Sequence, residues 1–174
     1  MPNNITQPTV YLQSGNPETE ARAPDGYSAG QLGSKLTVKV GGVAKTYQLV
    51  SVGTLPVAMV DNAVVWWSDR AAYEVTTDAA ALGRGHVAGI ARATAVAGQV
   101  TCIQIKGRGD VKFLAVPTAA PTAAGLICTP SATDGEADCL AAGTAALYPQ
   151  IGLSAGAPAA NIAAVDINIE DNTP

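Results

Sequence analysis

Few side chains in this 174-residue chain could carry out catalysis. A serine or cysteine nucleophile needs a base such as histidine, and the only histidine, His86, lies in a glycine-rich run at the start of a predicted strand. We interpret it as a structural or surface residue. Paired carboxylates could hydrolyse a glycosidic bond, but Asp61, Asp69 and Asp78 have no spacing that brings two of them together. We therefore expect a protein that is not an enzyme.

Metal and cofactor sites have equally little support. Cys102, Cys128 and Cys139 lack the Cys-x-x-Cys spacing of zinc sites, and a single histidine adds too few ligands. The glycine-rich segment 26–35 lacks the Gly-Lys-Ser/Thr ending of a phosphate-binding loop. We expect no metal and no cofactor. Cys128 and Cys139 flank a short loop and could bridge if they face each other, but buried, reduced thiols are the favoured interpretation for a cytoplasmic assembly.

Charge is divided unevenly along the chain, whose net charge is −4. All ten lysines and arginines lie at or before Lys112 together with eight acids, and six acids and no base follow. Nucleic-acid-binding proteins usually carry a clustered basic face, so we expect no nucleic-acid partner. The acidic last third either orients the molecule on a charged partner or is a solvated surface.

Two further patterns concern localisation. No stretch approaches the ~20 uninterrupted apolar residues that span a bilayer, so we expect no membrane partner. The first residues lack the basic and apolar regions of a signal peptide. We therefore expect a soluble protein that is made in the cytoplasm.

The first segment, residues 1–34, is predicted to be an extended N-terminal arm. It holds four prolines and four glycines, and only Thr9–Leu12 has the pattern of a strand. Proline cannot donate to a strand ladder and glycine breaks helices, so the arm cannot build its own core. It must be ordered by its own barrel, by a neighbouring subunit or by a larger surface.

Strand patterns begin at residue 35. Apolar residues alternate over 35–40, Gly41-Gly42 supplies a two-residue turn, and a return strand follows over 43–50. Short runs bounded by Gly, Pro, Asp or Asn predict further strands at 57–60, 63–67, 72–76 and 86–93. Residues 99–106 and 111–116 predict a second hairpin that turns at 107–110.

The last third of the chain gives two more strand signals. Within the Ala/Pro/Thr-rich region 117–148, Asp134-Gly135 lies between short apolar runs and predicts a hairpin. A helix over 136–147 is the alternative. Strict alternation from Ala163 to Glu170 predicts a half-buried final strand.

About ten short strands predict an all-β fold. We expect a single small β-barrel or jelly-roll-like sandwich over residues 35–174, preceded by the arm.

Aromatic residues provide the candidate partner-binding positions. Trp66 and Trp67 are adjacent in a predicted strand, whose neighbouring residues point to opposite faces. Either one ring enters the core and the other faces a partner, or the strand is buried on both faces. In the arm, Tyr11, Arg22 and Tyr27 are residue types that anchor interfaces.

One rhythm of short strands and glycines recurs over about residues 36–170. Its runs are 64–68, 73–76, 87–91, 98–107, 124–127, 134–137 and 151–153. This rhythm resembles that of tailed-phage capsid decoration (cement) proteins. The resemblance implies a small β-barrel, commonly a homotrimer, on the outer surface of the virion. There it would bridge subunits of the major capsid protein and stabilise the shell, and the resemblance brings no catalytic residues.

Two other classes of protein share this composition. Another virion component, such as a head fibre, a tail protein or a receptor-binding module, would bind host cells or glycans in place of capsids. A small trimeric β enzyme, such as a nucleotide hydrolase, would need a pocket of clustered acids, and the sequence reveals none.

Overall fold

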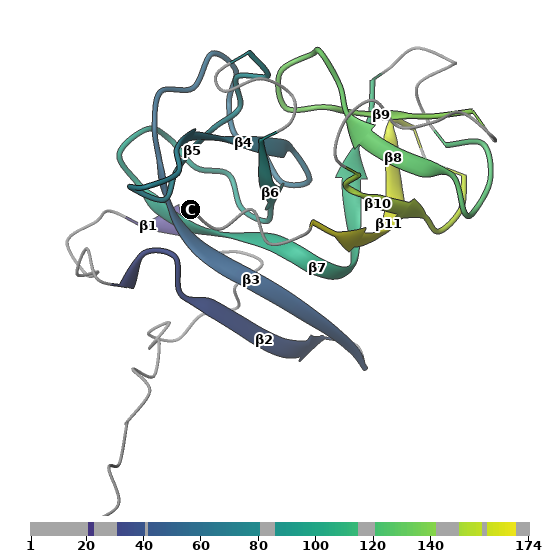
Figure 1. The fold of residues 1–174 in the computed structure, drawn as a ribbon, viewed down its shortest axis with the longest axis horizontal. Coiled ribbons are helices and arrows are strands. Elements are labelled where there is room, and N and C mark those ends of the chain that lie inside the picture. The colour runs from purple at the N-terminus through teal and green to yellow at the C-terminus, as the bar shows by residue number, and fades with distance from the viewer. Residues whose placement is uncertain are drawn as a thin grey trace, which may run out of the picture.

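The computed structural model describes residues 21–22, 31–40, 42–80, 86–114, 121–141, 150–157 and 160–169. These residues confirm the all-β fold, with eleven strands in one sheet (Figure 1). The strands are β1 (Ala21–Arg22), β2 (Lys35–Val40), β3 (Val43–Val52), β4 (Val64–Asp69), β5 (Glu74–Thr76), β6 (Val87–Ala91), β7 (Val100–Lys112), β8 (Ile127–Pro130), β9 (Ala137–Cys139), β10 (Gly152–Ser154) and β11 (Ile162–Asn168).

The first half of the sheet closes into a small barrel. β3 pairs with β5, β5 with β4, β4 with β6 and β6 with β7, and β7 returns to β3. Closure removes the open edges that a flat sheet of these strands would expose. Apolar side chains from all five strands fill this barrel, among them Val50, Trp67, Val75, Ala91 and Ile103.

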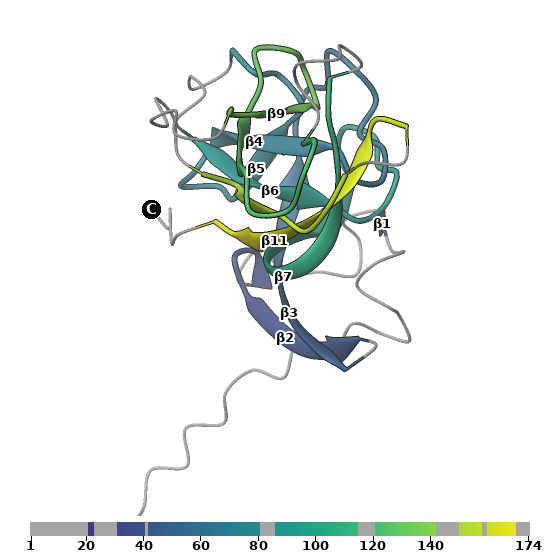
Figure 2. The same ribbon diagram turned by 90° about the vertical axis from the view of Figure 1, so that its right-hand side faces the viewer.

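The second half is built on the far end of β7. Residues 106–112 of β7 pair with β11, and the sheet continues through β10 and β8 to β9. A bridge between Phe113 and Ala137 then joins β9 to the chain just after β7. The fold therefore has two lobes: the first lobe is the barrel with β3 to β6, and the second lobe contains β8 to β11. The long β7 strand runs through both of them (Figures 1 and 2).

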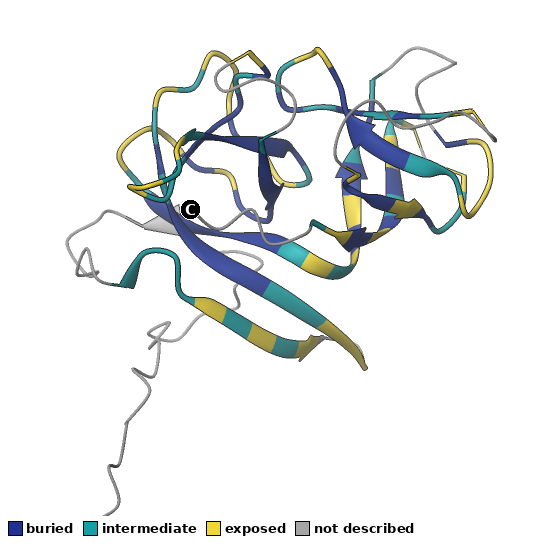
Figure 3. Cartoon of the chain, in the orientation of Figure 1, coloured by how far each residue is buried: buried dark blue, intermediate teal, exposed yellow. Residues whose placement is uncertain are grey.

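Strand β4 lies between two apolar cores. Val64 and Trp66 belong to the core that also holds Phe113, Val165 and other residues of the second lobe, whereas Val65 and Trp67 belong to the core of the first barrel. Both tryptophans are buried, and β4 is buried along most of its length (Figure 3). Of the two alternatives that the sequence left open, the strand buried on both faces is the one found, and no ring faces outward.

Several local predictions are confirmed. The turn after Val40 joins β2 to β3, and Gly42 has a φ of 83°. Asp134-Gly135 lies in the connection between the antiparallel strands β8 and β9. In β11, Ala163, Val165 and Ile167 are buried and alternate with more exposed residues.

The predicted hairpin at residues 107–110 is wrong, because β7 continues through them without a turn. Gly107 and Gly109 instead allow neighbouring groups to lie close to the main chain of β7. A Cβ on Gly107 would overlap the carbonyl oxygen of Ala44, and one on Gly109 would overlap the guanidinium of Arg92.

Two other predictions also fail in the described residues. Of the predicted strand 57–60, only Met59 is paired, through a bridge to Ala95. The alternative helix over 136–147 is replaced by β9 at residues 137–139, and residues 142–149 lie outside the described part of the chain.

Replacing Gly107 by alanine is expected to lower the free energy of unfolding by about 3 kcal/mol, because φ is 93° and the new Cβ meets main chain. Gly42→Ala is the matched control: its φ is 83°, but nothing lies within 4 Å of the added Cβ. The control should lose only about 1 kcal/mol. Urea unfolding of both variants measures the difference, and equal losses would contradict the close contact between β7 and Ala44.

Candidate attachment surface

The β2–β3 hairpin extends beyond the first barrel (Figures 1 and 2). Among the strands that the structure describes, β2 stands last in the sheet and pairs with β3 alone. The other end of β3 continues into the barrel, where residues 46–51 pair with β7. The hairpin is therefore an extension of the core that ends in an edge strand.

The hydrogen-bond pattern shows which main-chain groups of β2 point outward. The amide of Leu49 donates to the carbonyl of Ser34 at 3.0 Å. Bonded and non-bonded pairs alternate along an antiparallel ladder, so Leu36, Val38 and Val40 direct their main-chain groups toward β3. The amides and carbonyls of residues 35, 37 and 39 point away from β3, toward the edge.

The outward-pointing positions also carry a distinctive set of side chains. Lys35, Thr37 and Lys39 are exposed, and the hydroxyl of Thr37 lies 3.0 Å from that of Thr46 across the hairpin. Lys106, also exposed, is the register partner of Thr46 on β7. Residues 31–60 contain three lysines and no acid. This edge therefore combines basic side chains with main-chain groups oriented for strand pairing.

A small apolar cluster supports the base of the hairpin. Tyr47 and Leu49 of β3 pack with Val100 and Cys102 of β7, and Leu32 and Val38 lie against them. Tyr47 is fully buried. The sequence predicted a strand over 43–50, which β3 confirms. Its partner strand β7 could not be identified, because it lies about fifty residues away in the chain.

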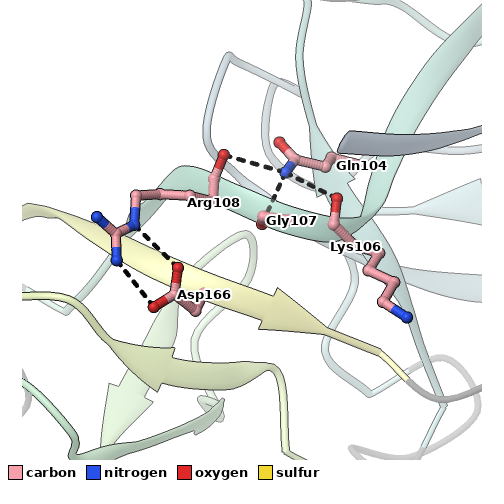
Figure 4. Close-up of polar contacts among 5 residues, drawn as sticks. All are labelled: Gln104, Lys106, Gly107, Arg108 and Asp166. Carbon is pink, nitrogen blue, oxygen red and sulfur yellow. Dashed lines mark hydrogen bonds and ion pairs between the residues drawn. The ribbon is translucent and has the colours of Figure 1, made fainter. Parts of the chain in front are cut away.

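Behind the hairpin, Gln104 holds a bend of β7 (Figure 4). Its side-chain amide donates to the carbonyls of Lys106 at 3.1 Å and Gly107 at 2.9 Å, with a longer contact of 3.4 Å to Arg108. These bonds satisfy carbonyls that the curved strand directs inward, so one buried side chain fixes the path of the main chain next to Ala44.

Arg92 completes this buried polar cluster. Its Nε donates to Oε1 of Gln104 at 2.7 Å and its Nη1 donates to Oδ1 of Asn62 at 2.6 Å. Arg92 is 5% exposed and Gln104 is fully buried. Charge-assisted hydrogen bonds at low exposure are strong, and Gly109 leaves the space that the guanidinium occupies.

The uneven charge of the sequence is partly neutralised in space. Arg108 forms a two-point ion pair with Asp166, at 2.9 and 3.0 Å, and Lys112 lies 3.0 Å from Glu136. The hydrogen bond to Arg108 lowers the pKa of Asp166. Two acids of the acidic last third therefore pair with bases of β7.

The candidate interface residues have different outcomes. Trp66 and Trp67 offer no ring surface to a partner, since both are buried. Arg22 lies in β1, which pairs with Val100 and Thr101 of β7. Residues 21–22 of the predicted arm therefore pair with the barrel of the same chain, which is one of the three possibilities that the sequence left open. Tyr11 and Tyr27, and the predicted strand at 9–12, lie outside the described residues.

Two places could suggest catalysis. A pocket of about 240 Å³ is lined by Thr54, Pro56, Ser68, Glu74, Thr76 and Asp78. In it Ser68 donates to Glu74 at 2.8 Å and Thr76 donates to the carbonyl of Thr54 at 2.6 Å. His86, whose Nδ1 lies 3.4 Å from Nη1 of Arg70, is not among the lining residues. The hydroxyls are therefore engaged by acceptors within the fold.

The second place is residues 152–156, which match the Gly-x-Ser-x-Gly pattern of a nucleophilic serine. That motif requires a sharp turn between a strand and a helix. Here Ser154 belongs to strand β10 and is 3% exposed. Its hydroxyl donates to the carbonyl of Ala123 at 2.7 Å and accepts from the amide of Leu126 at 2.9 Å. Ser154 therefore has a structural role, because its hydroxyl links β10 to the main chain at residues 123 and 126.

Comparisons of the chain with protein families, curated proteins and solved structures gave no match. In the described part of the chain, no three His, Cys, Asp or Glu side chains gather in a way that could hold a metal ion. The same residues include no helix long and apolar enough to cross a membrane.

Two features of this surface were missed in the sequence. The acid-free stretch 31–60 with its three lysines was a visible signal for a basic hairpin. The Arg92–Gln104 cluster gave no signal, because the two residues lie on different strands and neither follows a recognisable motif.

Proposed function

We propose that this chain is a capsid decoration protein that attaches to the outer surface of a phage head through its β2–β3 hairpin. The observation that carries the proposal is the basic edge strand on a closed core. The strand-and-glycine rhythm that resembles decoration proteins supports the same function. The proposed role is structural, without catalysis.

Strand addition is the proposed mode of contact. An extended segment of the major capsid protein would pair with the outward amides and carbonyls of Thr37 and Lys39, since an added strand gains main-chain hydrogen bonds from an exposed edge. The lysines favour an acidic segment and disfavour pairing with a second basic β2 edge. The partner is therefore expected to be an acidic, extended segment on the shell.

Stabilisation follows from mass action. A protein that binds the expanded shell but not looser states shifts the equilibrium toward the expanded shell. In this proposal three copies assemble on the virion surface, and the parts of the arm outside β1, with Tyr11 and Tyr27, reach across a seam to capsid protein. Deleting residues 1–20, which precede β1, should reduce occupancy on shells, and unchanged occupancy and shell stability would contradict the role of the arm.

The role of the edge is tested with Thr37→Pro. Proline removes the amide hydrogen that points away from β3, and edge strands tolerate such a residue because no ladder bond is lost. We expect at least a tenfold loss of affinity for expanded shells of the cognate major capsid protein. Co-sedimentation with such shells measures the affinity.

The matched control is Thr37→Val, which removes the hydroxyl contact with Thr46 but keeps the amide. It should bind within about twofold of the original chain, and circular dichroism should show both variants folded. Equal binding of the proline and valine variants would rule out strand addition at β2. Binding of the original chain to host cells or glycans, with no binding to shells, would support a fibre or receptor-binding role instead.

A further inference from the structure

Cys128 and Cys139 face each other across the β8–β9 hairpin. They are register partners in antiparallel strands, and both are buried thiols in the core of the second lobe. The sequence left open whether they could meet. The structure brings them together, whereas Cys102 lies in a separate cluster with Tyr47 and Leu49.

The hydrogen bonds of the hairpin define the kind of pair. The amide of Leu140 donates to the carbonyl of Ile127 at 2.9 Å, so the pair next to the cysteines is hydrogen-bonded. The carbonyl of Cys128 accepts from Ile151, on the opposite side from β9, at 2.8 Å. Because bonded and non-bonded pairs alternate, Cys128 and Cys139 form a non-hydrogen-bonded pair, the type whose side chains are closest.

We propose that Cys128 and Cys139 are a reversible disulfide site that joins β8 to β9 when the protein meets an oxidising low-molecular-weight disulfide. Cα atoms of a non-hydrogen-bonded pair lie about 4.5 Å apart, within the roughly 4.4–6.8 Å range of disulfides but near its short end. The exchange runs in both directions, so an excess of a small dithiol returns the pair to thiols. This site is independent of the proposed attachment to a shell.

The reaction is two thiol–disulfide exchanges. Cys139, 8% exposed against 0% for Cys128, is the first nucleophile. Its sulfur attacks the small disulfide RSSR, the S–S bond of RSSR breaks, and one RSH leaves with the proton from Cys139. The sulfur of Cys128 then attacks the mixed disulfide at Cys139 and releases the second RSH. The two cysteines lose two electrons and two protons, which reduce RSSR to two RSH.

The thiols are expected to react slowly while the hairpin is closed. Burial raises the pKa of Cys128 to about 12, and the neighbouring Cys139 adds to the shift. Burial also raises the pKa of Cys139, and the negative charge of Asp138 raises the same pKa by a smaller amount. Since the thiolate is the attacking form, exchange proceeds mainly when the hairpin opens locally.

The distribution of basic residues makes the test direct. Trypsin cleaves after lysine and arginine, and none follows Lys112, so one fragment, 113–174, carries both cysteines, whereas Cys102 falls in fragment 93–106. The folded chain is incubated with oxidised glutathione, quenched with acid, alkylated in denaturant, digested and analysed by mass spectrometry. We expect fragment 113–174 to be two hydrogens lighter and unalkylated, while Cys102 is fully alkylated. Dithiothreitol should restore both thiols.

Cys128→Ser and Cys139→Ser test the pairing. Each variant should leave a single thiol in fragment 113–174, alkylated or joined to glutathione, and no internal bridge. In the original chain, two alkylated cysteines in fragment 113–174 after equilibration with oxidised glutathione would overturn the proposal. So would a bridge that links fragments 93–106 and 113–174, and both results are read from the original chain without any variant.

Discussion

Replacing Trp66 by alanine is expected to lower the free energy of unfolding by about 3–5 kcal/mol, the usual cost of deleting a large buried ring. Trp66 is fully buried in the core shared with the second lobe, and Trp67 is 2% exposed in the core of the first barrel. Trp67→Ala should cost a similar amount. Chemical denaturation of the two variants measures both losses.

The location of the damage separates the two tryptophans. Amide hydrogen exchange should accelerate mainly in β8 to β11 for Trp66→Ala and mainly in β3 and β5 for Trp67→Ala, because each ring fills a different core. Phenylalanine at position 66 should recover most of the loss, since the indole N–H has no partner among the described residues. A loss below about 1 kcal/mol at either position would instead place that ring on the surface.

Replacing Gln104 by leucine is expected to lower the free energy of unfolding by about 3–4 kcal/mol. The variant loses the bond from Arg92 and leaves a buried charged group and main-chain carbonyls with fewer partners, each costing about 1–3 kcal/mol. Leucine keeps the approximate volume, so the effect comes from polarity. Thermal and urea unfolding measure it.

Two variants serve as controls for Gln104→Leu. Gln48 is also buried, but among the described residues its side chain bonds only to the carbonyl of Gly33, at 3.2 Å, so Gln48→Leu should cost about 1 kcal/mol. Gln104→Glu keeps an acceptor for Arg92 but loses the donor that faces the carbonyls. It should therefore also destabilise the protein, and a stability equal to the original would show that the carbonyl bonds contribute nothing.

The strands that could be predicted are those whose pattern is local. Alternation alone located β11, and a glycine pair located the turn between β2 and β3. The same local logic failed at Gly107 and Gly109, where glycine signals closeness to Ala44 and Arg92, residues distant in the sequence, instead of a turn. A single sequence does not distinguish a glycine needed for a turn from one needed for contact.

The candidate site was harder to predict than the fold. The sequence left open whether Trp66 and Trp67 mark an interface or a strand buried on both faces, because it could not reveal that β4 has a core on each face. The main-chain groups of β2 point outward on one side because β2 lies at the end of the sheet among the strands that the structure describes. That position depends on pairing between strands that are far apart in the sequence, such as β3 and β7. The three lysines were visible in the sequence, but their position on an edge strand was not.

The most direct test of the proposed function is a cryo-electron-microscopy reconstruction of expanded heads, assembled from the cognate major capsid protein and incubated with the purified chain. We expect added density on the outer surface of the head, with β2 of this chain paired to a strand of the shell. Bare heads at saturating protein, or bound protein whose β2 edge faces away from the shell, would contradict it.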